Sequence, residues 1–187
     1  MPEKELYMTD NRKLRLFRGS ELDFSTKLLL VIWLLFQSIF FRTSFTPRFL
    51  SLLLLRLFGA SIGKNVSFRR GFRVHFPWNL EIGDDCWIGE EVWFINHEKV
   101  TIGSNVSISQ RSIICSGSHD YRSESLEYAH KAVVIKDGAW VCLGAKVLPG
   151  VTIGECSVVS AGEIVRKSLP DYSMLIGGQV RQIDPPK

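Results

Sequence analysis

The chain has 187 residues, enough for one domain with a sizeable core. A composition of 45% hydrophobic and 22% charged residues excludes a chain that is disordered throughout. The net charge of +4 is unevenly spread, because residues 1–73 hold 13 Lys and Arg against 5 Asp and Glu, while residues 74–187 hold 10 against 14. The basic part has no recognisable nucleic-acid motif, so we expect no nucleic-acid partner and favour an anionic membrane surface.

Two apolar segments follow a polar lead. The first, Leu28 to Phe41, has 14 residues without a charge, which is short of the about 20 that a membrane-spanning helix needs. No small-residue cleavage site follows, so a signal peptide is not indicated. The second segment begins at Phe49 and ends at Gly59. Together they predict a helical hairpin, which either packs on protein or lies in the plane of the membrane face. Three cations would favour the membrane: Arg42, Arg48 and Arg56.

From Ile62 onward, aliphatic or aromatic residues recur every six positions, often followed by glycine. At two points the repeat shifts by two residues, and it then runs unbroken from Ile135 to Val165. Three six-residue units, each a short strand and a turn, close one triangular coil of about 18 residues, which predicts a β-solenoid rather than a β-sandwich. The inward positions are Ile62, Phe68, Val74, Leu80, Ile82, Ile88, Phe94, Ile102, Ile108, Ile114, Ile135, Val141, Val147, Ile153, Val159 and Val165.

The stretch CSGSHDYRSESLEYAH, residues 115–130, interrupts the repeat with polar residues and holds two of the four histidines. A solenoid tolerates a loop at a coil corner because the stacked core stays intact, and such loops concentrate function. The four cysteines show neither a C-x-x-C pair nor a metal-site spacing with a histidine, so we expect reduced packing residues, no bound metal and a cytoplasmic protein.

The repeat, the G-S-H-D of the loop and the block AWVCLGAKVLPGVTIGECSVVSAGEIVRKSLP resemble the hexapeptide-repeat acyltransferases. Within them the chain is most similar to the maltose, galactoside and nodulation acetyltransferase branch, and there to the colanic-acid and exopolysaccharide acetyltransferases. The segments LLLRLFGASIGKNV, PWNLEIGD, ISQRSIICSGSHD and KSLPDYSMLIGG carry that closer likeness, which covers about residues 56–183.

The resemblance implies an all-β fold, a left-handed parallel β-helix of hexapeptide repeats with an N-terminal apolar helical segment and a corner loop. It divides the chain into a polar lead with apolar hairpin (1–58), a β-helix acyltransferase domain (59–183) with loop 115–130, and a tail (184–187). It also implies CoA-dependent O-acetyl transfer from acetyl-CoA to a sugar hydroxyl. His119 matches the family's general base, a task suited to histidine near neutral pH.

By the same resemblance, the donor would contact seven residues. Backbone groups of four small residues would lie along pantetheine, Trp140 would line the groove, and two cations would meet the nucleotide phosphates. The four small residues are Gly144, Ala145, Ala161 and Gly162. The cations are Arg166, where the family has threonine, and Lys167. On the acceptor side we expect Asn96, Asp120 and Tyr121. We expect His97 and His130 to be surface residues.

The expected partners are a sugar or lipid-linked saccharide of exopolysaccharide, capsule or lipopolysaccharide synthesis, two further copies in a homotrimer, and the inner membrane face through residues 28–58. A non-enzymatic alternative is an inactive, membrane-seated scaffold trimer of the same fold. A γ-class carbonic anhydrase is rejected, because its H-x-x-x-x-H zinc pair is absent. A serine acetyltransferase is rejected, because its long helical N-terminal domain and its active-site sequence are absent.

Overall fold

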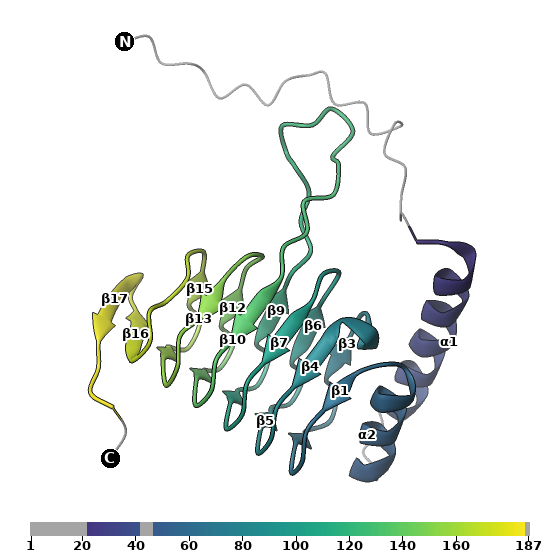
Figure 1. Cartoon of the computed structure of the whole chain (residues 1–187), viewed down its shortest axis with the longest axis horizontal. Helices are drawn as coiled ribbons and strands as arrows, with labels where there is room; N and C mark the ends of the chain where they lie inside the picture. Colours follow the sequence, from purple (N-terminus) through teal and green to yellow (C-terminus); the bar gives the residue numbers. More distant parts are fainter. Residues whose placement is uncertain (1–21, 42–46, 186–187) are drawn as a thin grey trace.

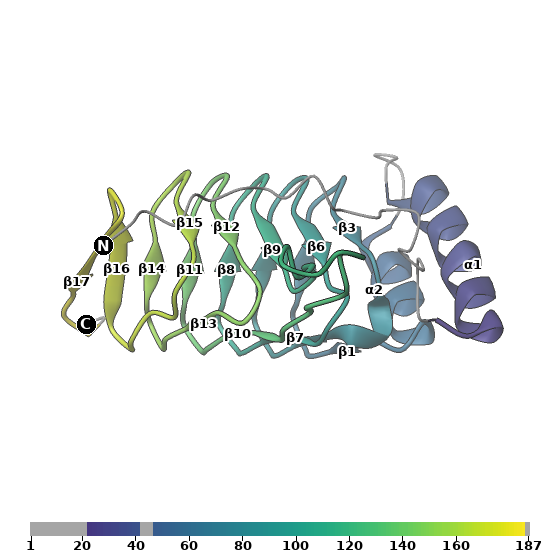
Figure 2. The ribbon, with the colours of Figure 1, turned by 90° about the horizontal axis from the view of Figure 1, so that it is seen from above.

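The computed structural model describes residues 22–41 and 47–185, so most of the predicted polar lead, together with Arg42, lies outside the described residues. The described chain is a triangular prism of three parallel sheets, with two helices at one end and a β-hairpin at the other (Figures 1 and 2). This is the predicted left-handed parallel β-helix of hexapeptide repeats.

Short strands from successive coils stack in register to form each sheet. The first sheet contains β1 (Ser61–Ile62), β4 (Leu80–Ile82), β7 (Val100–Ile102), β10 (Val133–Ile135) and β13 (Thr152–Ile153). The second contains β2 (Ser67–Phe68), β5 (Trp87–Ile88), β8 (Ser107–Ile108), β11 (Trp140–Val141), β14 (Val158–Val159), β16 (Ser173–Ile176) and β17 (Gln179–Gln182). The third contains β3 (Arg73–Val74), β6 (Trp93–Ile95), β9 (Ile113–Cys115), β12 (Lys146–Val147) and β15 (Ile164–Val165).

The core of the prism consists of the residues that the six-residue period selects. All sixteen are buried, with at most 9% of any side chain exposed. In the first sheet, Ile62, Ile82, Ile102, Ile135 and Ile153 pair in one register column. Because burying one such side chain is worth about 1.5–3 kcal/mol, the stacked columns stabilise the fold even though most strands have only two or three residues.

Two helices cover the first coil. Helix α1 (Phe24–Phe40) begins four residues before the predicted apolar run, and α2 (Arg48–Leu57) leads into β1. The rings of Trp33 and Phe36 contact Phe58, at centroid distances of 5.2 and 5.9 Å. Helix α1 therefore packs against the residue that follows α2, and Leu55 of α2 is fully buried. Within residues 22–41 and 47–185, no helix is long and apolar enough to cross a membrane.

The prism has a wide corner, which we call the third corner, where the chain leaves the third sheet and returns to the first. Ile62 to Ile82 and Ile82 to Ile102 are each 20 residues apart, whereas Ile135 to Ile153 is 18. The two extra residues of the early coils account for the re-phasing of the repeat. They fall at 75–79, which includes the 3-10 helix η2 (Pro77–Asn79), and at 96–99. The predicted loop leaves the same corner one coil later (Figure 1).

Candidate active site

Buried polar side chains hold the third corner in shape. The amide oxygen of Asn96 accepts the backbone N–H groups of His75 and Phe76, at 3.1 Å each, and its NH₂ donates to the carbonyl of Phe76. Asn96 is 0% exposed. The structure thus uses this predicted acceptor residue to fix one coil against the next. Asn96 satisfies both backbone groups of Phe76, and it shares the N–H of His75 with the carbonyl of Phe94.

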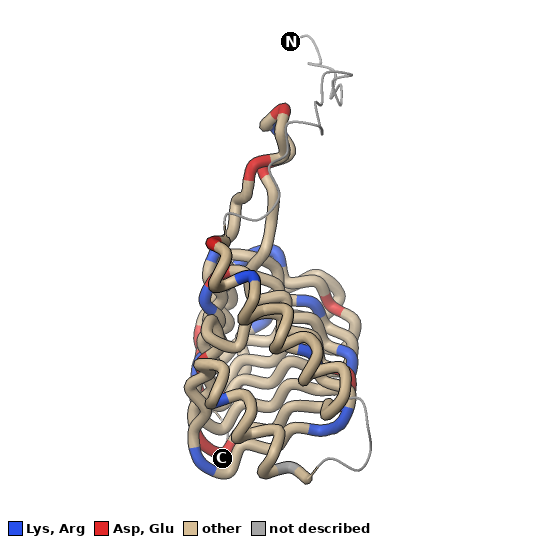
Figure 3. The backbone as a smooth tube through the Cα atoms, turned by 90° about the vertical axis from the view of Figure 1, so that its right-hand side faces the viewer, with Lys and Arg blue, Asp and Glu red and all other residues tan. Residues whose placement is uncertain are grey.

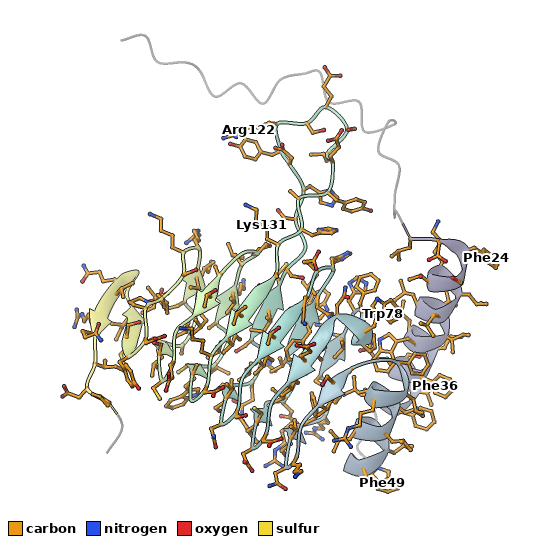
Figure 4. All side chains as sticks on the ribbon, viewed as in Figure 1. Phe24, Phe36, Phe49, Trp78, Arg122 and Lys131 are labelled. Carbon is orange, nitrogen blue, oxygen red and sulfur yellow. The ribbon has the colours of Figure 1, made fainter. Side chains whose placement is uncertain are left out.

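The loop leaves the corner as a hairpin. At its base the hydroxyl of Ser116 accepts the N–H of Glu98 (2.9 Å) and donates to its carbonyl (2.7 Å). The stem, which we define as residues 116–120 and 127–131, has three backbone rungs: Lys131 N–H to Ser116 O, Ala129 N–H to Ser118 O, and Asp120 N–H to Glu127 O, all 2.8–2.9 Å. Figure 3 shows the loop standing clear of the prism with acidic residues along it, and Figure 4 shows Arg122 near its tip and Lys131 at its base.

A backbone carbonyl orients His119. Nδ1 of the ring lies 2.6 Å from the carbonyl oxygen of Leu126, across the loop. Because a carbonyl can only accept, Nδ1 carries the proton, and Nε2 is the nitrogen that can take a second one. Leu126 adopts a left-handed conformation (φ 53°), which is uncommon for a side chain of this kind and turns its carbonyl across the hairpin. The ring is exposed.

The two residues after His119 shape the tip of the loop. The carboxylate of Asp120 accepts the backbone N–H of Arg122 at 2.9 Å, closing a local turn. Tyr121 is 65% exposed, and the guanidinium of Arg122 lies 5.3 Å from the centre of its ring. Two of the three predicted acceptor residues, Asp120 and Tyr121, therefore stand on the same hairpin as His119. Asp120 holds the turn, while Leu126 orients the ring.

All four histidines of the chain belong to one column of rings, which sequence reasoning did not find. We define the imidazole column as His75, His97, His130, Tyr128 and His119, whose successive ring centroids are 4.9, 4.8, 4.7 and 5.0 Å apart. The column runs from the wide corner of the prism up the stem of the loop. The expectation that His97 and His130 are surface residues is wrong, since both are half-buried here.

The column disfavours positive charge at its prism end. Burial, followed by the neighbouring histidines His75, His130 and His119, lowers the pKa of His97 to about 4. Burial also lowers the pKa of His75, whose Nδ1 has no hydrogen-bond partner among the described residues. These rings are therefore neutral near pH 7 and contribute shape and polarity rather than charge.

Three of the predicted pantetheine residues lie at the second corner, between the second and third sheets. Gly144 and Gly162 have positive φ (67° and 75°) and open space where a side chain would stand, and Ala161 is exposed beside them. Ala145 differs, because its side chain is buried, its N–H donates to Cys142 O and its carbonyl accepts from Ile113 N–H. The coil therefore already uses both backbone groups of Ala145.

The remaining donor residues lie on either side of that corner. Trp140 is outward on the second sheet, half-exposed, with its indole N–H bonded to Ser109 Oγ at 2.9 Å. Arg166 and Lys167 are exposed at the third corner, directly after β15. In one chain the third sheet thus separates Gly144 and Gly162 from the cations and from the loop with His119. Among the described residues, no group of three or more His, Cys, Asp or Glu is placed to hold a metal ion.

Comparisons with known proteins agree with this architecture. No protein-family model matches the chain. The chain is 44% identical over 117 residues, 63% of its length, to the candidate colanic acid biosynthesis acetyltransferase WcaF of Escherichia coli, and the match spans 64% of that relative. It is 36% identical over 115 residues, 62% of its length, to the galactoside O-acetyltransferase of Lactococcus lactis, and there spans 50% of the relative. The chain thus matches less than two thirds of these relatives.

Solved structures of acetyltransferases superpose on most of the chain. A maltose O-acetyltransferase from Clostridium difficile superposes with a TM-score of 0.78 over 87% of this chain and 90% of its own, at 23% identity. A hexapeptide-repeat acetyltransferase from Vibrio cholerae, solved with acetyl coenzyme A, superposes with a TM-score of 0.76 over 89% of this chain and 93% of its own, at 24% identity. The chain therefore has the left-handed β-helix fold of the hexapeptide-repeat acetyltransferases. Its sequence relatives are acetyltransferases by name, with those of colanic acid and galactoside among them.

Proposed function

We propose that the protein is a CoA-dependent O-acetyltransferase that moves acetyl from acetyl-CoA to a hydroxyl of a sugar. The observation that carries the proposal is His119, held with Nδ1 on the Leu126 carbonyl at the stem of an exposed loop, on a fold shared with acetyltransferases. The likeness to proteins named for colanic acid and galactoside acetylation supports a saccharide acceptor, free or lipid-linked, in exopolysaccharide, capsule or lipopolysaccharide synthesis.

In the proposed reaction Nε2 of His119 takes the proton of the acceptor hydroxyl as its oxygen attacks the thioester carbonyl. The bond between that carbonyl carbon and sulfur then breaks, and the thiolate of CoA takes the proton back from the imidazolium. The Leu126 carbonyl stabilises the positive ring between these steps, because it keeps accepting from Nδ1. A base positioned in this way is worth about 10²–10⁴-fold in rate.

The separation of the donor residues supports a homotrimer with its sites between subunits. Gly144 and Gly162 at the second corner and Arg166 and Lys167 at the third face different sides of one prism. In a ring of three prisms, the second corner of one copy can meet the third corner of the next. The donor would then lie in the groove between them, with its phosphates on Arg166 and Lys167 and its thioester towards His119.

The helical end of the prism supports a membrane-seated site. Of the large hydrophobic side chains exposed in the described chain, most lie on α1 and α2: Phe24, Leu28, Leu29, Val31, Ile32, Leu34, Leu35, Phe36, Ile39, Phe49, Leu53 and Leu57. Phe24 and Phe49 point away from the prism in Figure 4. Neither helix contains an acidic residue, and Lys27 flanks the apolar face. We propose that this face lies in the interface of the inner leaflet and brings the cytoplasmic site to a lipid-linked acceptor.

Calorimetry with acetyl-CoA tests the proposal first. The expected result is micromolar binding that weakens at least tenfold in an Arg166→Ala/Lys167→Ala variant, because two cations no longer meet the phosphates. Release of free thiol with a panel of sugar acceptors then tests transfer. A folded trimer that binds no acetyl-CoA would favour the alternative, a scaffold with the same fold.

A further inference from the structure

The ring of His130 stands at the point where the loop stem meets the prism. Its Nδ1 accepts the backbone N–H of Ser118 at 3.0 Å, and the neighbouring Ala129 N–H donates to Ser118 O at 2.9 Å. Residues 129 and 130 thus hold both backbone groups of Ser118. Since Ser118 directly precedes His119, this double contact sets where the chain places the His119 ring.

Packing fixes the His130 ring itself. It lies between the rings of His97 and Tyr128, with centroid distances of 4.8 and 4.7 Å and interplanar angles of 38° and 46°. The ring of His119 is edge-on to it, at a centroid distance of 6.5 Å. The opposite limb of the stem also lies against the corner, because a Cβ added to Gly117 would come within 2.8 Å of His97 Cδ2. His130 is therefore wedged between the prism corner and the loop, with little room for another position.

The hydrogen bond to Ser118 depends on the protonation state of His130. A neutral imidazole can accept at Nδ1, whereas an imidazolium carries protons on both nitrogens and only donates. The titratable groups that face the ring are His97, with His75 behind it, His119 and Tyr128. Further out on the stem stand Asp120 and Glu127, and Lys131 follows at its base. If His130 takes up a proton, its Nδ1 becomes a donor that faces the N–H donor of Ser118, and the hydrogen bond between them is lost.

We propose that His130 is a positioning residue for His119: as a neutral ring it clamps the loop stem through Ser118, and its protonation releases the stem. The clamp is a property of the fold, while its effect on acetyl transfer rests on the proposed function. If both hold, release of the clamp by protonation of His130 lowers activity on the acid side.

Hydrogen exchange tests the clamp without any substrate. His130→Asn keeps an acceptor oxygen near the position of Nδ1 and does not titrate, whereas His130→Phe keeps a ring and removes the acceptor. In wild type, peptides containing Ser118 should exchange about five to ten times faster at pH 5 than at pH 8, after correction for intrinsic rates. We expect His130→Asn to be equally protected at both pH values and His130→Phe to be unprotected at both.

The proposal is overturned if the exchange protection of Ser118 in the wild-type protein does not change with pH. This measurement uses the wild-type protein alone, so it does not depend on the folding of a variant. Protection in His130→Phe equal to wild type at pH 8 overturns it as well. For transfer, we expect His130→Phe to lower kcat about tenfold with unchanged KM for acetyl-CoA, and His130→Asn to give a shallower acid limb of the pH profile. A pH-dependent stem in a protein without transfer activity would instead overturn the proposed function and leave the clamp standing.

Discussion

The indole N–H of Trp33, on α1, donates a hydrogen bond of 2.8 Å to the carbonyl oxygen of Val74, at the end of β3. The N–H of the same Val74 donates to the side-chain oxygen of Gln37, one turn further along α1, at 2.6 Å. One residue of the first coil is thus held at both backbone groups by one helix. This fixes which face of α1 looks outward.

We predict that Trp33→Ala lowers the free energy of unfolding by about 3–5 kcal/mol, because it removes a fully buried ring and leaves the Val74 carbonyl without its donor. Urea unfolding monitored by circular dichroism measures the change. Ile39→Ala is the matched control on the same helix, since Ile39 is 58% exposed and should change stability by under about 0.5 kcal/mol. Equal losses in the two variants would mean that α1 does not dock as described.

We predict that His119→Ala reduces acetyl transfer by about 10²–10⁴-fold and leaves thermal stability unchanged, because the ring is exposed at the stem of the loop. The rate of thiol release with a fixed acceptor measures the first effect, and calorimetric melting the second. Acetyl-CoA affinity should stay within about twofold of wild type, which separates loss of the base from loss of the donor site. A variant that keeps more than a tenth of the rate would contradict the assignment.

The low pKa of His97, about 4, makes the fold sensitive to acid. Its folded pKa lies below the unfolded value of about 6.5, so the unfolded chain binds more protons between these values, and stability falls as the pH drops through that window. Allowing for solvent around the half-buried ring, we expect a loss of roughly 1–2 kcal/mol between pH 7 and pH 4 that His97→Phe removes. Urea unfolding at successive pH values measures it, and parallel curves for the two proteins would refute it.

Flotation with vesicles tests the apolar face. We expect the full-length protein to rise with vesicles that contain anionic lipid, and Leu35→Gln/Ile39→Gln to remain at the bottom of the gradient while folded. Val180→Gln is the matched control, because Val180 is 51% exposed but lies on β17 at the other end of the prism. If wild type stays with the soluble fraction, or if the control loses binding as the double variant does, the membrane proposal fails.

The six-residue period was sufficient to predict the prism and its core, because an aliphatic residue at every sixth position is typical of the stacked core of a β-solenoid. It could not predict the imidazole column. His75 and His97 fall where two extra residues widen the corner, and His130 is the last residue of the interruption, so the six-residue period does not link them. The carbonyl that orients His119 belongs to Leu126, whose positive φ has no signature in a residue of this type. Family likeness located His119, but not its hydrogen bond or its neighbours.

The two ends of the prism are closed by different means, and this limits how copies can assemble. At one end α1 and α2 lie over the first coil, and at the other β17 turns back antiparallel on β16 and presents side chains that are all exposed, Arg181 among them. A stack of parallel strands would otherwise offer a template at each end for the next molecule. At the hairpin end, a second copy that continued the second sheet would have to pair with β17, which runs antiparallel to the stack. This disfavours simple end-to-end growth of the prism and favours contact between copies along its flanks.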